Sequence, residues 1–96
     1  MRRAAKIDGN QPEIVKAFRK FGCSVLLLHM VGGGCPDIAV GKNKKTVLVE
    51  IKDPNKVLSK RELTKEEAKF HSEWLGSLLV VESLEDVINV VRALER

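Results

Sequence analysis

The spacing of apolar residues changes several times along the chain, and each change marks the boundary of a predicted element. From Asn10 to Gly22 the apolar positions follow a helical period, at Ile14, Val15, Ala17, Phe18 and Phe21. Asn10 is a favourable N-cap residue, and Glu13 stands where a capping box places an acidic side chain. The pattern predicts a helix that begins after Asn10 and ends at Gly22.

Three apolar runs separated by turn residues follow this helix and predict three strands. The first run covers residues 23–31 and ends at the glycines 32–34. The second covers 36–41, and the third, over 46–52, is rich in residues that favour strands. Because only a short polar turn at 42–45 separates the last two runs, we expect them to form an antiparallel hairpin.

The second half of the chain alternates helix and strand patterns. Residues 53–62 are polar and predict a loop, and residues 64–75 predict a helix with Glu67 at its capping-box position. An apolar run at 78–81 predicts a fourth strand, and Ser83 caps a last amphipathic helix. The predicted order is α-β-β-β-α-β-α. The helix between the third and fourth strands implies a right-handed crossover, and therefore parallel pairing of these strands.

Composition agrees with one α/β domain over residues 1–96, built on a four-stranded mixed sheet flanked by helices. The chain is 44% hydrophobic and 31% charged, which excludes a disordered tail, and its 96 residues exclude a modular protein. No apolar run reaches the ~20 residues that span a bilayer, and no signal peptide opens the chain. We therefore expect a cytoplasmic protein without membrane association.

The net charge of +4 is unevenly distributed. Residues 1–69 hold 15 of the 17 basic side chains, whereas residues 70–96 hold five acidic side chains and two basic ones. A basic surface favours a polyanionic partner, most often nucleic acid. A solvated, lysine-rich surface accounts for the same charge.

The third predicted strand carries charge where a central strand normally carries none. Leu48, Val49 and Ile51 make it apolar on both faces, yet Glu50 and Lys52 stand two residues apart and so share one face. Burying such charges costs several kcal/mol unless they are paired or bound to an ion. A pair that only fixes the strand register would explain them equally well.

Asp37 adds a second acidic group to this face. If the hairpin turn is centred between Asn43 and Lys44, Asp37 lies opposite Glu50, with Cβ atoms roughly 4.5–5.5 Å apart unless a bulge shifts the register. Two carboxylates at that distance repel unless a proton or a cation lies between them, and their oxygens suit Mg²⁺ or Mn²⁺. Lys52 would then orient a water or stabilise charge on a phosphate, as in metal-assisted phosphodiester hydrolysis.

These residues resemble the motif of a known nuclease superfamily. The segment Gly34-Cys35-Pro36-Asp37, twelve further residues and then Glu50-Ile51-Lys52 resemble the PD-(D/E)-x-K nucleases. The element order is similar to their restriction-endonuclease-like core. Within the superfamily the chain is most similar to the small stand-alone VRR-NUC (virus-type replication-repair nuclease) domains of phages.

The resemblance implies roles for individual residues. Asp37 and Glu50 would be metal ligands for Mg²⁺ or Mn²⁺, the backbone carbonyl of Ile51 a further ligand, and Lys52 the catalytic lysine. Glu13 matches an acidic residue of the first helix that helps to hold the metal, although the capping box explains Glu13 as well.

Two residues of the second predicted helix, and one earlier histidine, have roles that the sequence leaves open. Glu67 stands where the family often has Gln, and it is also the capping-box residue. His71 follows four residues later on the same helical face, as a general base or packed beside Trp74. His29 fits a core or edge position of a strand.

Basic residues would hold a DNA backbone without reading its sequence. They form an N-terminal arm and a set from the hairpin turn and the following loop: Arg2, Arg3, Lys6, Lys42, Lys44, Lys45, Lys56, Lys60 and Arg61. A solvated surface accounts for each of them singly.

The sequence thus predicts a divalent-metal-dependent DNA endonuclease. The resemblance suggests flap, junction or other branched DNA in replication, recombination or repair. A domain this small offers little surface, so we expect a homodimer, and a further protein partner remains open. The alternatives are a non-catalytic nucleic-acid-binding or assembly module on the nuclease fold, and a purely structural α/β protein.

Overall fold

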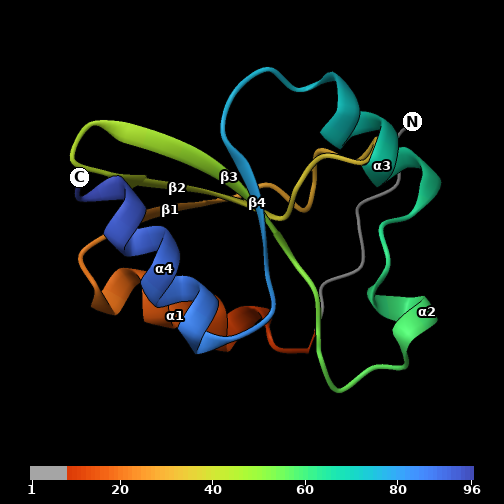
Figure 1. Cartoon of the computed structure of the whole chain (residues 1–96), viewed down its shortest axis with the longest axis horizontal. Coiled ribbons are helices and arrows are strands. Elements are labelled where there is room, and N and C mark those ends of the chain that lie inside the picture. The colour runs from red at the N-terminus through yellow and green to blue at the C-terminus, as the bar shows by residue number, and fades with distance from the viewer. Residues whose placement is uncertain (1–8) are drawn as a thin grey trace.

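A four-stranded sheet organises residues 9–96, the part of the chain that the computed structural model describes (Figure 1). The elements in chain order are α1 Gln11–Lys20, β1 Ser24–Leu27, β2 Ile38–Lys42, β3 Lys45–Ile51, α2 Leu58–Arg61, α3 Lys65–Glu73, β4 Leu78–Val81 and α4 Leu84–Leu94. The strands lie in the order β1-β2-β3-β4. The first three are antiparallel to their neighbours, and β4 is parallel to β3. The predicted α/β class, mixed sheet and parallel crossover are confirmed.

Local chemistry explains the hairpin at the centre of the sheet. Asn43 and Lys44 both have positive φ angles, 55° and 64°, as the tight turn of a two-residue hairpin requires. Lys42 pairs with Lys45, and the register runs on to Ile38 opposite Val49. The predicted centre of the turn is therefore confirmed, and both strands extend one residue further into it than predicted.

Several predicted boundaries were wrong, among them the end of the helix predicted over 64–75, which ends at Glu73. Of the strand predicted over 23–31, only Ser24–Leu27 (β1) forms. The chain turns after Leu28, because the Leu28 carbonyl accepts a hydrogen bond from the Val31 N–H at 2.9 Å. The strand predicted from residue 36 begins at Ile38. The predicted loop 53–62 contains the short helix α2, which buries none of its residues and so leaves no apolar period in the sequence.

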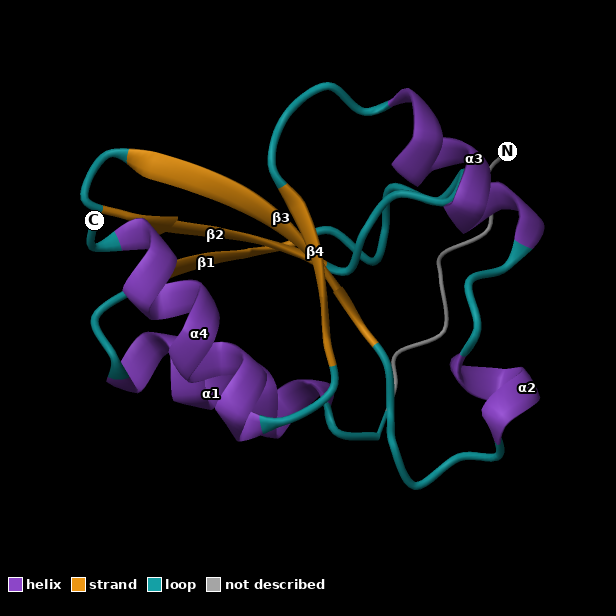
Figure 2. Ribbon diagram, viewed as in Figure 1, coloured by secondary structure: helices purple, strands orange, loops and turns teal. Residues whose placement is uncertain are grey.

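Helices α1 and α4 pack side by side against one face of the sheet (Figure 2). Their buried side chains meet those of the strands in one core, which includes Ile14, Phe18, Ile38, Val40, Val49, Ile51, Val81, Val87 and Val91. Each fully buried side chain of this kind contributes about 1.5–3 kcal/mol. This packing fixes which face of β3 points away from the helices, and that face carries Glu50.

Helix α3 approaches the other face near the end of β3. Gly34 makes the approach possible: its φ is +81°, and a Cβ there would lie 2.3 Å from the Glu66 carbonyl oxygen. The rest of this face is open, with Leu26 63% exposed and Val80 43% exposed. Within residues 9–96 no helix is both long and apolar enough to cross a membrane.

The side chains at the N-termini of α3 and α4 cap their helices, whereas the one at the N-terminus of α1 does not. Thr64 and Glu67 form the predicted capping box, and the Ser83 hydroxyl accepts the Asp86 N–H. Asn10 makes no side-chain cap, so the capping box predicted with Glu13 was wrong. Instead, Asn10 Nδ2 donates to the Lys52 carbonyl at 3.0 Å and to the Glu82 carbonyl at 3.5 Å, which ties α1 to the ends of β3 and β4.

Candidate functional site

Two buried acidic residues face each other where β2 begins and β3 ends. Asp37 and Glu50 lie one step beyond the last ladder pair, Ile38 and Val49, and are 6% and 2% exposed. Their carboxyl groups are close enough to share a hydrogen bond. The predicted juxtaposition of positions 37 and 50 is therefore confirmed.

The backbone beside this pair is shaped by a proline. Continuing the register places Pro36 opposite Ile51. The Ile51 N–H donates to Asp37 Oδ2, at 2.6 Å, instead of to a backbone carbonyl of the neighbouring strand. Pro36 has no N–H, so β2 cannot supply the ladder donor that the Ile51 carbonyl oxygen would otherwise accept.

Lys52 is buried between two carboxylates. Its Nζ lies 2.8 Å from Glu67 Oε1 and 4.0 Å from Glu50 Oε2, and the residue is 6% exposed. Its backbone is held on both sides, because its N–H donates to the Val81 carbonyl at 3.0 Å and its carbonyl accepts from Asn10. The lysine is thus fixed at the end of β3 before any ligand is bound.

Glu67 serves the helix cap and the lysine at once. Its Oε1 accepts the Thr64 N–H at 2.9 Å as well as the Lys52 ammonium. Burial would raise the pKa of Glu67, but the hydrogen bonds from Lys52 and Thr64 outweigh it and the pKa is lowered. Glu67 therefore remains ionised beside Lys52. The two roles that the sequence left open for Glu67, cap and site neighbour, coexist.

The site carries excess negative charge. Burial raises the pKa of Glu50 to about 10, and the hydrogen bond and charge of Asp37, followed by the charge of Glu67, act in the same direction. Lys52 opposes this only in part. Three carboxyl groups thus surround one lysine, and in the absence of a cation Glu50 holds a proton.

His71 also faces the site. Its Nε2 lies 3.9 Å from Glu50 Oε1, and both atoms are buried with no hydrogen-bond partner among the described residues. Burial lowers the pKa of His71, and it is neutral near pH 7. Phe70 and Trp74 stack on each other, with ring centroids 5.5 Å apart.

The donor set fits a hard divalent cation. Asp37 and Glu50 offer carboxylate oxygens, one of them the partnerless Glu50 Oε1, and the Ile51 carbonyl lacks its ladder donor. Oxygen ligands of this kind suit Mg²⁺ or Mn²⁺, which keep several waters. No group of three or more His, Cys, Asp and Glu side chains within residues 9–96 is arranged to hold a metal, so a cation at Asp37 and Glu50 would need main-chain and water oxygens to complete its shell.

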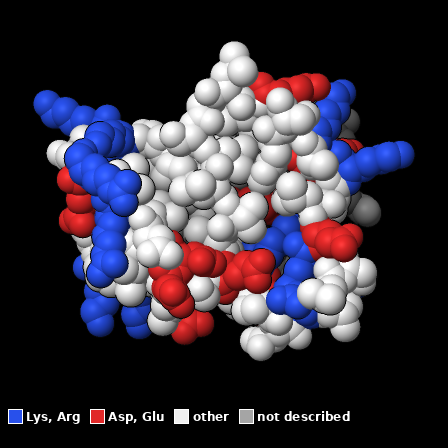
Figure 3. All heavy atoms as spheres, viewed as in Figure 1, with Lys and Arg blue, Asp and Glu red and all other residues white. Residues whose placement is uncertain are grey.

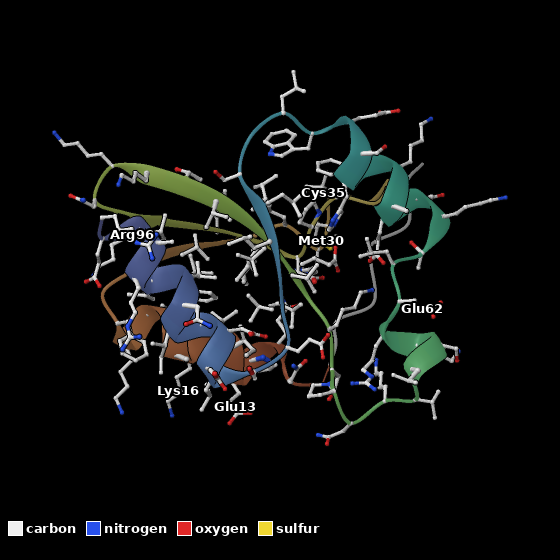
Figure 4. All side chains as sticks on the ribbon, in the orientation of Figure 1. Glu13, Lys16, Met30, Cys35, Glu62 and Arg96 are labelled. Carbon is white, nitrogen blue, oxygen red and sulfur yellow. The ribbon has the colours of Figure 1, made fainter. Side chains whose placement is uncertain are left out.

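Glu13 does not join this group. Its side chain is exposed, and Figure 4 shows it on the outer side of α1, pointing away from the sheet. It lies on the side of its helix opposite the buried positions, which are Gln11, Ile14, Val15 and Phe18. The contribution of α1 to the site comes instead from Asn10, whose amide reaches the backbone of Lys52.

The predicted basic residues of the hairpin turn lie far from the carboxylates. Figure 3 shows basic side chains gathered at the end of the molecule that holds the β2–β3 turn and the C-terminus. Five residues of strand, roughly 17 Å, separate Lys42 from Asp37. Lys42 Nζ donates to the Phe21 carbonyl at 2.7 Å, and Lys45 Nζ donates to the Arg96 carbonyl. Lys44 is exposed.

The other predicted basic residues divide into two sets. Arg2, Arg3 and Lys6 lie outside the described residues. Lys56, Lys60 and Arg61 follow β3 in the segment that leads to α3, and Arg61 Nη1 lies 3.7 Å from Glu82 Oε2.

The sequence did not reveal three contributions to the site: the Asn10 bond to Lys52, the missing donor at Pro36 and the close approach at Gly34. Pro36 could have been noticed once the register was predicted, because position 36 then faces Ile51. The other two depend on contacts between distant segments. Comparison with models of known protein families, with curated proteins and with solved structures gives no match to this chain.

Proposed function

We propose that the protein is a divalent-metal-dependent DNA endonuclease of the PD-(D/E)-x-K type, acting on flap, junction or other branched DNA. The observation that carries the proposal is the buried Asp37–Glu50 pair beside Lys52 at the end of the hairpin. Burying two acidic side chains and a lysine on one face of the sheet lowers the stability of the fold. A purely structural role does not explain why these side chains are buried there.

The cation would be held by Asp37, Glu50 and the carbonyl of Ile51. Bound there, Mg²⁺ or Mn²⁺ would polarise a phosphate oxygen and lower the pKa of a water. Glu50 must give up its proton for the cation to enter, because both compete for the same oxygens. Asp37 is held in position by the Ile51 N–H and needs no rearrangement.

Lys52 would act on the phosphate. Its ammonium group stabilises the negative charge that develops as water attacks phosphorus and the P–O bond breaks. Glu67, 2.8 Å from that ammonium, holds it 4.0 Å from Glu50. His71, neutral and facing Glu50 Oε1, stands where it can accept a hydrogen bond from a water beside the pair.

The test is cleavage of a DNA panel (single strand, duplex, flap and four-way junction) with Mn²⁺. Asp37→Asn keeps the shape and removes the charge, while Glu85→Gln, exposed in the first turn of α4 on the opposite face, is the matched control. We expect cutting by wild type and Glu85→Gln, none by Asp37→Asn, and loss of all cutting in EDTA. Equal cutting by all three proteins would mean that another nuclease or another site is responsible.

The second candidate is a non-catalytic nucleic-acid-binding or assembly module. It is favoured by one observation, that Lys52 already has Glu67 as a close partner and so has no free ammonium to offer a phosphate. This hypothesis predicts DNA binding that survives EDTA, with no cleavage of any substrate by wild type.

A homodimer would provide the surface that one small domain lacks. The open sheet face leaves Leu26 and Val80 exposed, and Leu75 beside it is fully exposed. A second copy covering these side chains would remove apolar surface from water. An unidentified protein partner could occupy the same face.

A further inference from the structure

The β2–β3 turn and the C-terminal ends of α1 and α4 lie together at one end of the molecule (Figure 1). Lys42 Nζ donates to the Phe21 carbonyl at 2.7 Å, and Lys45 Nζ donates to the Arg96 carbonyl. Both helices therefore end beside the turn. We call this surface the basic end, and it carries Lys20, Lys42, Lys44, Lys45, Arg92 and Arg96.

The basic end holds more positive charge than the fold needs. Residues 20–24, 41–46 and 91–96 include six basic side chains and one acidic side chain, Glu95. A helix C-terminus carries a partial charge of about −0.5, so about one positive charge balances the two helix ends. The ion pair of Lys42 with Glu95, at 3.7 Å, balances one more. Roughly four positive charges remain, and they favour a polyanionic partner.

A shallow depression of about 390 Å³ opens at the basic end. Its lining includes Lys42, Lys44 and Lys45 together with Gly22, Ser24, Gly41 and Thr46. The two glycines have no side chain, so a ligand can approach the main chain closely there. An ammonium group has three N–H donors, and the bonds to the Phe21 and Arg96 carbonyls use one donor of Lys42 and one of Lys45. The lysines therefore keep donors for an anion in the depression.

The distance from the basic end to the carboxylate pair matches half a turn of DNA. Lys45 and Glu50 stand five residues apart on β3, which is roughly 17 Å. One turn of B-DNA is about 34–36 Å long and holds about 10–10.5 base pairs. After half a turn, a strand that touched the protein has passed to the far side of the duplex. The complementary strand then faces the protein.

The surface between the basic end and the carboxylate pair offers little charge to hold a phosphate. Residues 75–81, which include the edge strand β4, have no charged side chain. Figure 3 shows mostly uncharged atoms in the middle of this side of the molecule. A single strand that crosses this surface would place its phosphates over uncharged atoms. A duplex can turn a groove toward it, with phosphates only at the two sides of the groove.

We propose that the basic end binds the complementary strand of a duplex arm, about five base pairs from the phosphate at Asp37 and Glu50. The contact is with phosphates and therefore reads no base sequence. It makes a paired arm of at least about five base pairs part of the substrate. The inference rests on the proposed function and deepens it, because it defines one arm of the branched DNA.

The first test is fluorescence anisotropy in EDTA with a labelled duplex of one and a half helical turns. Lys44→Asn removes one charge of the basic end, and Asn tolerates the positive φ of this position. Loss of one phosphate contact should lower the slope of log K against log salt by about 0.9 and weaken binding about eightfold at ~0.1 M salt. Lys16→Gln removes an exposed charge on the outer side of α1 and should change neither quantity (Figure 4). Equal losses in the two variants would overturn the proposal.

The second test compares arm lengths in the cleavage reaction with Mn²⁺. One flap substrate has a paired arm of one full helical turn beyond the cut, and the other has an arm of a quarter turn closed by a short loop. Wild type should cut the long-armed flap with a kcat/KM about eightfold higher, and Lys44→Asn should cut both at the lower rate. Equal wild-type rates on the two flaps would overturn the proposal. So would an equal rate on a flap whose long arm is left single-stranded.

The two tests separate this contact from the proposed nuclease activity. Lys44-dependent duplex binding by a protein that cuts no DNA would support the basic end and contradict the nuclease. Cutting that does not depend on arm length would contradict the basic end and leave the nuclease standing. Polyglutamate that displaces the duplex at equal charge concentration would identify a site for an acidic protein and overturn the proposal.

Discussion

Glu50 is the residue at which stability and proposed function conflict most directly. It is 2% exposed, shares a hydrogen bond with Asp37, and leaves Oε1 without a partner. A well-packed apolar or amide side chain would satisfy the fold at lower cost. Side chains that weaken a fold in this way are commonly found where ligands bind.

Replacing Glu50 should therefore stabilise the protein without metal. The pKa of Glu50 rises from 4.5 to about 10 on folding, so the folded state keeps a proton that the unfolded state has lost. Below pH 4.5 this protonation causes no loss of stability. As the pH rises from 4.5 toward 10, the free energy of unfolding falls by at most about 1.4 kcal/mol per pH unit. Glu50→Gln removes this loss. Urea unfolding in EDTA should show the variant more stable than wild type at pH 8, with a smaller difference at pH 5.

The same unfolding experiment with added Mn²⁺ should give the opposite result. Mn²⁺ should raise the stability of wild type at pH 8, because an ion that binds only the folded state stabilises it, and it should leave Glu50→Gln unchanged. Parallel pH profiles for the two proteins in EDTA would show that Glu50 is not protonated on folding.

Glu67 should matter through Lys52 more than through its cap. Glu67→Ala removes the partner at 2.8 Å from Lys52 Nζ, whereas Glu67→Gln keeps an oxygen acceptor. We expect cleavage to fall at least tenfold in Glu67→Ala and to be largely retained in Glu67→Gln. Thr64→Ala removes the cap hydroxyl but leaves the Glu67 side chain, so it should cost about 1 kcal/mol of stability with little loss of rate. Equal rates in Glu67→Ala and Thr64→Ala would assign Glu67 a capping role alone.

The sequence predicts the register of the β2–β3 hairpin, but it does not predict the position of helix α3. A two-residue turn fixes the register of its strands, so Asn43 and Lys44 suffice to place Asp37 opposite Glu50. The position of α3 depends on contacts with Gly34 and Lys52, which are distant in sequence. No local pattern encodes such contacts, and in the sequence the three glycines mark only the end of a predicted strand.

Helix α1 shows the same limit at its first residue. Asn10 is a favoured N-cap residue, but its Nδ2 donates to two strand-end carbonyls and its Oδ1 accepts no N–H of the helix. Because Asn10 does not cap the helix, the predicted capping box with Glu13 does not form. Propensity predicted the helix correctly and its capping contacts incorrectly, because tertiary hydrogen bonds outweigh a local one.

Gly34 should be the least replaceable of the three glycines. Gly34→Ala combines a φ of +81° with a Cβ placed 2.3 Å from the Glu66 carbonyl oxygen, which would push α3 away from the sheet. Gly33→Ala is the control, since Gly33 has a φ of +65° and lines an open cavity. We expect Gly33→Ala to cost about 1 kcal/mol and Gly34→Ala at least twice as much. Similar Tm values for the two variants would mean that α3 is not held closely there.

At the scale of the whole molecule, the two faces of the sheet are unequally covered. Helices α1 and α4 cover the central strands of one face, whereas α3 lies over the other face only near the end of β3 (Figure 2). The remaining strip includes Leu26 and Val80 from the two edge strands. Apolar side chains on an open face and unpaired strand edges both favour association.

We therefore expect a dimer in solution that one charge on the open face disrupts. Val80→Lys should shift sedimentation equilibrium toward monomer. Ile88→Lys, at a similarly exposed apolar position on α4, should remain dimeric. A monomeric wild type at high protein concentration would contradict the dimer and leave the face for a different partner.

The proline at position 36 has a consequence for how this site can be lost. The Ile51 carbonyl lacks a ladder donor because the residue opposite it in the continued register, Pro36, has no N–H, and this is a property of the backbone. Any other residue at position 36 restores an N–H and allows one more ladder bond to form. Such a change would strengthen the sheet while occupying the Ile51 carbonyl, a proposed ligand of the cation. A more stable protein with every proposed catalytic side chain intact would then be inactive, and a comparison of side chains alone would give no reason for it.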